Sequence, residues 1–127
     1  MMMIGKGEKV AHILLEKIFP DATIHEQVHV GRLFNRDLRK ELSSRQQKET
    51  VDLVVYRKDR RPMVIRIQDK RHLSKYMSNV DNAQQTYLEW SNCDVVNVPE
   101  NECPALFKDK VNTVSEAELL KYIEPYL

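Results

Sequence analysis

The stretch VDLVVYRKDRRPMVIRIQDKRH, residues 51–72, decides the fold that we expect for this chain. Val51–Tyr56 is largely apolar and rich in valine, which is typical of a buried strand. Arg57–Pro62 is a basic hairpin connection in which Asp59 suits a turn. Met63–Gln68 follows as a second strand, whose alternate side chains should face opposite sides of a sheet. One set is Met63, Ile65 and Ile67, and the other is Val64, Arg66 and Gln68.

The segments before this hairpin predict a helix, a strand and a polar surface segment. Apolar residues recur at helical spacing through Glu8–Phe19, and Pro20 ends them. Alternating residues in Thr23–Val30 predict a strand that Gly31 ends. Residues 32–50 carry many charges and few apolar side chains. We therefore expect a helical turn there, followed by the polar loop SSRQQKE on the surface.

The segments after the hairpin predict a basic loop, a helix, a strand and a final helix. They are Asp69–Ser78, Val80–Trp90, Asp94–Val98 and Ser115–Tyr126, the last opening with a capping box at residues 115–118. This order indicates the α/β class, with a small mixed sheet flanked by helices. The crossover through the first of these helices should make the strands on either side of it parallel.

Length and composition limit the protein classes to consider. With 127 residues, 42% of them hydrophobic, the chain suits a single domain over residues 1–127. An aromatic content of 7% argues against a surface that stacks many unpaired bases. Cys93 and Cys103 lack the partners of a zinc finger, which needs about four ligands. The apolar start MMMI is too short for a signal peptide or membrane span, so we expect a cytoplasmic protein with reduced thiols and no membrane partner.

The net charge of +1 hides an uneven distribution. Residues 57–75 hold eight Lys and Arg against two Asp, whereas residues 76–127 hold three basic and nine acidic residues. A basic block of this kind is what the phosphate backbone of a nucleic acid attracts. It is equally typical of a solvated turn, because local charge blocks are common.

Asp52 is the sharpest chemical signal, because a carboxylate within a buried strand needs a partner. One possible partner is a hard divalent cation, which binds carboxylate oxygens, polarises a phosphate and lowers the pKa of a bound water. A lysine two residues beyond a carboxylate would lie on the same face of a strand and add positive charge beside that water. The other possible partner is Arg66, which the neighbouring strand places within reach of an ion pair.

These elements resemble the restriction-endonuclease-like superfamily, the PD-(D/E)XK nucleases. The resemblance covers the first helix, the hairpin strands, His72 in the loop, the helix near Tyr87 and the strand Asp94–Val98. It implies a restriction-endonuclease-like core and cleavage of nucleic acid with Mg²⁺ or Mn²⁺. Within it, Asp52 takes the place of the metal-binding aspartate and Glu8 that of the acid often found on the first helix.

Two positions depart from the pattern of the family. Arg66 stands where the family has its second carboxylate, and Gln68 stands where it has lysine. A guanidinium beside a cation costs about 4 kcal/mol per unit charge at about 4 Å and an effective dielectric constant near 20. We therefore expect an Asp52–Arg66 ion pair to replace the metal. A shifted alignment would use Asp69 and Lys70 instead, and it requires a bulge in the strand.

We expect a non-catalytic nuclease-like domain that needs no cofactor and binds nucleic acid through the hairpin and loop. The residues expected to contact nucleic acid are Arg57, Lys58, Arg60, Arg61, Lys70, Arg71, His72 and Lys75. One alternative is an active endonuclease that uses Mg²⁺ or Mn²⁺, with Asp52 and either Glu8 or Asp69 as acids and with Gln68 near the water. Another is a protein-interaction module, in which the acidic part of one copy pairs with the basic part of a second copy in a homodimer.

Overall fold

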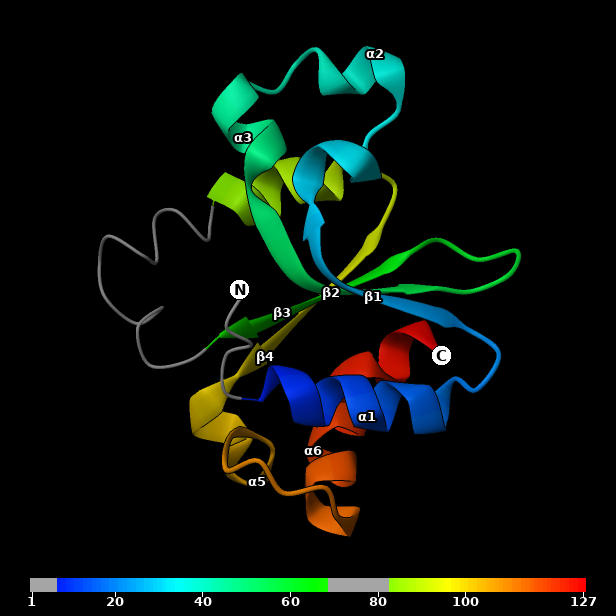
Figure 1. Ribbon diagram of the computed structural model, residues 1–127, viewed down its shortest axis with the longest axis vertical. Coiled ribbons are helices and arrows are strands. Elements are labelled where there is room, and N and C mark those ends of the chain that lie inside the picture. The colour runs from blue at the N-terminus through cyan, green and yellow to red at the C-terminus, as the bar shows by residue number, and fades with distance from the viewer. Residues whose placement is uncertain (1–6, 69–82) are drawn as a thin grey trace.

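A computed structural model describes residues 7–68 and 83–127 of the chain. Its centre is a four-stranded sheet with the order β1-β2-β3-β4 (Figure 1). β1 is antiparallel to β2 and β2 to β3, whereas β3 and β4 are parallel. The strands are β1 (Thr23–His29), β2 (Thr50–Tyr56), β3 (Met63–Gln68) and β4 (Asp94–Pro99). The predicted α/β class, mixed sheet and parallel pair are confirmed.

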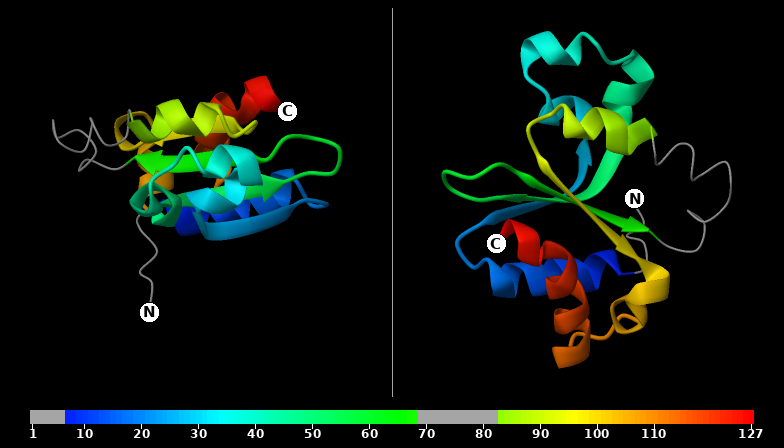
Figure 2. Two further views of the ribbon diagram at one scale, coloured as in Figure 1. Left: turned by 90° about the horizontal axis from the view of Figure 1, so that it is seen from above. Right: turned by 180° about the vertical axis from the view of Figure 1, so that it is seen from behind.

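Helices cover both faces of this sheet (Figure 2). One face carries α1 (Glu8–Ile18), α5 (Pro104–Phe107) and α6 (Thr113–Ile123), and the other carries the helical residues 83–89 and the segment 30–48. The 3-10 helix η3 (Glu100–Glu102) follows β4, and the 3-10 helix η4 (Glu124–Tyr126) follows α6. Ile65 and Ile67 pack with the first group, and Val64 packs with the second, as their alternation predicted. Within the described ranges, none of the helices is long and apolar enough to cross a membrane.

The segment between β1 and β2 is more regular than its sequence suggested. It forms a 3-10 helix and two short α-helices, η1 (Val30–Leu33), α2 (Arg36–Arg39) and α3 (Ser44–Lys48). The expectation of a polar loop at SSRQQKE is wrong, because Ser43 caps α3. The Ser43 hydroxyl accepts a hydrogen bond from the Gln46 N–H, and the Gln46 side chain accepts one from the Ser43 N–H. This reciprocal cap starts a helix without help from an apolar face.

The cap of α6 also differs from the expected one. Asn112 caps this helix, since its Oδ1 accepts from the Ser115 N–H at 2.9 Å and its own N–H donates to the Ser115 hydroxyl at 3.0 Å. Glu118 instead accepts from the main-chain N–H groups of Ala105 and Leu106, at 3.2 and 2.9 Å. The expected box of Ser115 and Glu118 is wrong because a tertiary contact with the start of α5 engages the glutamate.

Candidate functional site

Asp52 lies at the point where β2 separates from β3. The described ladder between these strands runs as far as the pair Leu53 and Ile65. Beyond that pair, the main-chain N–H of Ile67 donates to Oδ2 of Asp52 at 2.6 Å. The carboxylate thus stands in for a main-chain carbonyl of the ladder, and the strand break holds it in a defined position.

Glu8, the first residue of α1, brings a second carboxylate to Asp52. The two side chains share a hydrogen bond, and Glu8 is only 7% exposed. Gly7 precedes it with a φ angle of 85°, a left-handed conformation that glycine adopts without strain. A Cβ atom at Gly7 would lie 3.5 Å from Cγ2 of Ile67, so α1 begins against β3, whose Ile67 N–H donates to Asp52 of β2. The structure therefore brings together the two acids that the resemblance singled out.

Burial and the contact with Glu8 raise the pKa of Asp52 to about 7. Burial is the largest cause, because the charged form loses hydration; the hydrogen bond and the negative charge of Glu8 add to it. The N–H of Ile67 and the positive charge of Arg66 lower the pKa, and Arg66 has the smallest effect of all. Carboxyl pairs of this kind are typical of places where a protein holds a proton or a cation.

Gln27 is part of the site, although no role for it was predicted from the sequence. Its φ angle of 50° is unusual for a residue other than glycine, and the pairing of β1 with β2 skips Gln27 and Asp52. Nε2 of Gln27 donates to Oε2 of Glu8 at 3.0 Å, and its Oε1 accepts from the Thr50 hydroxyl at 3.1 Å. Unfavourable backbone conformations that the surrounding fold maintains are concentrated at functional sites. The one signal in the sequence was that Gln27 is a polar residue in a strand that could pair with the strand of Asp52.

We expect replacements of Gln27 to separate the role of its backbone from that of its amide. Gln27→Gly should be more stable than Gln27→Ala by about 1 kcal/mol, because only alanine retains a strained left-handed conformation. Both variants should bind Mn²⁺ about tenfold more weakly than the wild type if the amide orients Glu8 as a ligand. Urea titration and calorimetry would measure the two effects. Equal stability of the glycine and alanine variants would contradict the backbone argument.

The predicted ion pair between Asp52 and Arg66 is wrong. Arg66 is 4% exposed, and its Nη1 donates to Oε1 of Gln85 at 3.1 Å and to Oδ1 of Asn97 at 3.2 Å. Gln85 belongs to the helical residues 83–89, which lie on the sheet face opposite α1. Asp52 turns toward α1 because the ladder breaks at this point, whereas regular pairing would have placed both side chains on one face.

Other predicted site residues are placed only in part. Gln68 ends β3 opposite Pro99 of β4 and is half-buried, and a role for it near a water stays a prediction. Several predicted residues lie outside the part of the chain that the structure describes. They are Asp69 and Lys70 of the shifted alignment, and Lys70, Arg71, His72 and Lys75 of the expected nucleic-acid surface.

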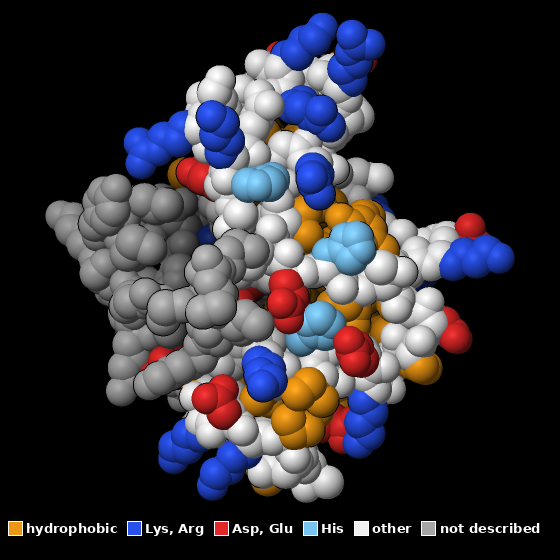
Figure 3. All heavy atoms as spheres, in the orientation of Figure 1, with side chains coloured by type: hydrophobic (Ala, Val, Ile, Leu, Met, Phe, Trp, Pro, Cys, Tyr) orange, Lys and Arg blue, Asp and Glu red, His pale blue; other side chains and the backbone are white. Residues whose placement is uncertain are grey.

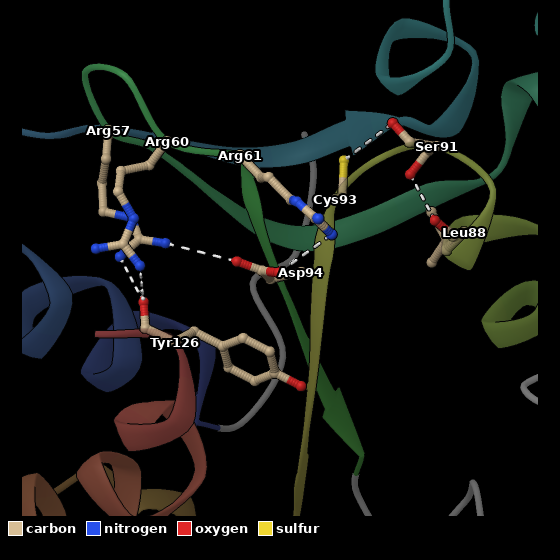
Figure 4. Close-up of polar contacts among 8 residues, drawn as sticks. All are labelled: Arg57, Arg60, Arg61, Leu88, Ser91, Cys93, Asp94 and Tyr126. Atoms are coloured by element: carbon tan, nitrogen blue, oxygen red, sulfur yellow. Dashed lines mark hydrogen bonds and ion pairs between the residues drawn. The ribbon is translucent and has the colours of Figure 1, made fainter.

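The basic hairpin uses several of its cations to hold the protein together (Figure 4). Nη1 of Arg57 and Nη2 of Arg60 donate to the main-chain oxygen of Tyr126, at 2.7 and 2.9 Å. Nη2 of Arg57 also lies 3.7 Å from Oδ2 of Asp94, and its guanidinium lies 5.3 Å from the centre of the Phe19 ring. Arg57 therefore joins β2, β4 and the C-terminal segment rather than facing solvent.

The hairpin also lies away from the two carboxylates. It connects the ends of β2 and β3 that are remote from Asp52 and Ile67 (Figure 1). About 13 Å of strand separate Asp52 from Tyr56, at about 3.3 Å per residue. Nη1 of Arg61 approaches Asp94 to 4.0 Å, although its side chain stays largely exposed, and Lys58 is exposed as well. Nucleic-acid binding by the hairpin stays a prediction, with fewer available cations than the sequence suggested.

The carboxyl pair can bind a divalent cation or share a proton. Within residues 7–68 and 83–127 there is no group of three His, Cys, Asp or Glu side chains that could hold a metal. Mg²⁺ is nevertheless commonly bound by one or two carboxylates together with waters and substrate phosphates. Glu8 and Asp52 fit such a site, because both are acids, both are largely buried and they lie in contact.

Comparisons of the chain with protein-family models, with curated proteins and with solved structures found no match. The similarity to PD-(D/E)XK nucleases therefore stays a prediction from a short motif. The side chains that bear on the function of this chain are above all Glu8, Gln27 and Asp52.

Proposed function

We propose that this chain is a divalent-metal-dependent phosphodiesterase that acts on nucleic acid, with Glu8 and Asp52 as metal ligands. The observation that carries the proposal is the contact between these two largely buried carboxyl groups. Carboxylates held together away from water repel each other, and a cation would relieve that repulsion. The nucleic acid is the substrate class that the resemblance implies and that the surplus of exposed cations favours.

The residues of the site have distinct tasks in this proposal. A bound cation would supply a polarised phosphate and a water with a lowered pKa. The Ile67 N–H positions Oδ2 of Asp52, and the Gln27 amide positions Oε2 of Glu8. One oxygen of each carboxylate is thus held by the protein, and the proton shared by the two acids must leave when a cation binds. Gln68, at the end of β3, would have the task of orienting a water.

The contacts of Arg66 support an active site over an inactive one. The expectation of a lost activity assumed that its guanidinium would occupy the metal position beside Asp52. Its Nη1 is instead hydrogen bonded to Gln85 and Asn97, and its charge has the weakest influence on the pKa of Asp52. A cation between Glu8 and Asp52 would therefore meet less repulsion than the strand alternation predicted.

Nicking of supercoiled plasmid tests the proposal. With Mn²⁺ or Mg²⁺, the wild-type chain should convert supercoiled plasmid to open circles, and EDTA should stop the reaction. Asp52→Asn and Glu8→Gln should each slow nicking by at least about a hundredfold, since loss of even a supporting residue costs about 10- to 100-fold. Glu16→Gln is the matched control on the same helix, because Glu16 is exposed and pairs with His12. Plasmid that stays intact with every metal would overturn the catalytic proposal.

A non-catalytic nucleic-acid-binding domain is the second candidate. It is favoured by the lack of a third carboxylate near Glu8 and Asp52 among the described residues. In that case the shared proton is a structural feature, and no Mn²⁺ binding should be measurable by calorimetry.

For either function we propose a location in the cytoplasm, which suits the two buried free thiols of Cys93 and Cys103. Formation of a homodimer stays a prediction.

A further inference from the structure

The segment that joins β1 to β2 concentrates positive charge on one part of the surface. We call residues 30–48 the basic lobe; they comprise η1, α2 and α3. Between residues 32 and 48 the chain carries six Lys and Arg against two acidic residues. Figure 3 shows Lys and Arg side chains gathered over the upper part of the molecule, where α2 and α3 lie in Figure 1. All six cations are exposed: Arg32, Arg36, Arg39, Lys40, Arg45 and Lys48.

The six cations of the basic lobe are free to contact a partner, whereas Arg57 and Arg60 of the hairpin already bind other parts of the protein. None of the six forms an ion pair within residues 7–68 and 83–127; Arg39 donates only to the main-chain oxygen of Phe34, at 3.1 Å. By contrast, Arg57 and Arg60 are engaged with Tyr126 and Asp94. Unpaired surface cations gain most from an external polyanion, because no internal contact has to be broken.

The basic lobe is fixed to the body of the protein, so its charges are held in place. Leu33, Phe34 and Leu42 are buried in the apolar cluster on this face of the sheet. Nε2 of Gln47 donates to the main-chain oxygens of Arg39 and Leu42, both at 3.1 Å, and so joins α3 to the end of α2. A binding surface that is ordered in advance loses less conformational entropy when a partner arrives.

The basic lobe also lies at the end of the sheet that carries the carboxyl pair. The N–H of Val30 donates to the oxygen of Glu49 at 2.7 Å, which holds the two ends of the lobe together. The next residue, Thr50, opens β2 and donates to Gln27, which in turn donates to Glu8. Nucleic acid on the lobe would therefore lie at the end of the sheet that carries Glu8 and Asp52, although the lobe packs on the face opposite α1. Nucleic acid on the hairpin would lie at the other end of the sheet.

We propose that the basic lobe binds the phosphate backbone of duplex nucleic acid and brings it to the Glu8–Asp52 pair. This inference deepens the proposed function and rests on it for the choice of substrate. A duplex fits better than a single strand, because the one aromatic residue of the lobe, Phe34, is buried and cannot stack on an unpaired base. Contacts to phosphates would be independent of base sequence and strongly dependent on salt.

The test compares two triple variants with the same change in net charge. Arg36→Glu, Lys40→Glu and Arg45→Glu alter the basic lobe, and Lys108→Glu, Lys110→Glu and Lys121→Glu alter exposed lysines beyond β4. Binding to a fluorescein-labelled DNA duplex of about 20 base pairs would be followed by anisotropy in EDTA, over a range of salt concentrations. The lobe variant should bind at least about tenfold more weakly and lose about three units of salt slope, roughly one per phosphate contact. The control variant should lose much less.

Several outcomes would overturn the inference. Equal losses of DNA affinity in both triple variants would show that net charge alone causes the effect. Tighter binding to a single strand of the same length would contradict the proposal that the lobe binds a duplex. Binding confined to vesicles of anionic phospholipid would assign the lobe to another partner. A triple glutamine variant at the same three lobe positions should also bind DNA more weakly, and its circular dichroism spectrum should match that of the wild type. A matching spectrum would show that the loss of binding does not come from unfolding. Asp52→Asn should bind the duplex as tightly as the wild type while losing nicking. A wild type that binds the duplex through the basic lobe but leaves plasmid intact with every metal would overturn the catalytic proposal alone.

Discussion

In the absence of metal ions, the protein should lose stability as the pH rises from about 4 to 7. The pKa of Asp52 is about 7 in the folded protein, against 3.8 for an ordinary aspartate. A raised pKa means that the folded state binds the proton more tightly. Its contribution is complete below about pH 4 and disappears as the pH rises through 7, with a magnitude on the order of 4 kcal/mol. Urea titrations in EDTA at a series of pH values would measure this loss.

The variant Asp52→Asn isolates that contribution. Its amide can accept from the Ile67 N–H and donate to Glu8, so the hydrogen bonds of the site survive without the second charge. At pH 8 and without metal, we expect this variant to be more stable than the wild type. Mn²⁺ should reverse the order, because a ligand that binds only the folded wild type stabilises it. If the stability of the wild type and that of Asp52→Asn changed with pH in the same way, the proposal that Asp52 and Glu8 share a proton would be contradicted.

Replacement of Arg66 should be among the most damaging changes in the protein. Arg66→Met removes a buried charged donor and leaves acceptor oxygens of Gln85 and Asn97 without it. Hydrogen bonds to charged groups contribute about 1.5–3 kcal/mol each, so we expect a loss of about 2–4 kcal/mol. Thermal and urea unfolding would measure it, and the far-ultraviolet circular dichroism spectrum should stay unchanged.

A double-mutant cycle shows which partner Asp52 has. The coupling free energy between Asp52→Asn and Arg66→Met should be below about 0.5 kcal/mol, because the two side chains form no ion pair. The coupling between Asp52→Asn and Glu8→Gln should exceed about 1 kcal/mol, since these groups share a hydrogen bond. A larger coupling with Arg66 than with Glu8 would restore the ion pair that strand alternation predicted.

Sequence patterns predicted the strands and the longer helices well, because these patterns are local. The alternation in Met63–Gln68 and the helical spacing in Glu8–Phe19 depend on neighbours one to four residues away. The short helix at Ser44–Lys48 was missed, since its capping box lies in a polar stretch without an apolar face. The α6 cap was assigned to the wrong residue, because Glu118 is engaged by α5, more than ten residues away.

The two acids of the candidate site could be named from the sequence, but their surroundings could not. Asp52 was recognisable as a carboxylate in a buried strand, and Glu8 followed from the resemblance. The contact of Gln27 with Glu8 depends on a left-handed backbone conformation that arises only where the sheet is interrupted. The direction of Arg66 likewise depends on where the β2–β3 ladder ends.

The periodicity of the sequence therefore determined the helices and strands. The packing of distant segments determined which group each charged side chain contacts. The basic block at residues 57–75 looked like one binding surface, yet Arg57 and Arg60 bind a main-chain oxygen at Tyr126. The six cations of residues 32–48 looked like an ordinary solvated segment, yet all six are exposed and none forms an ion pair with another described residue. Charge is a property of a residue, whereas its availability depends on which elements the fold brings within about 4 Å of it.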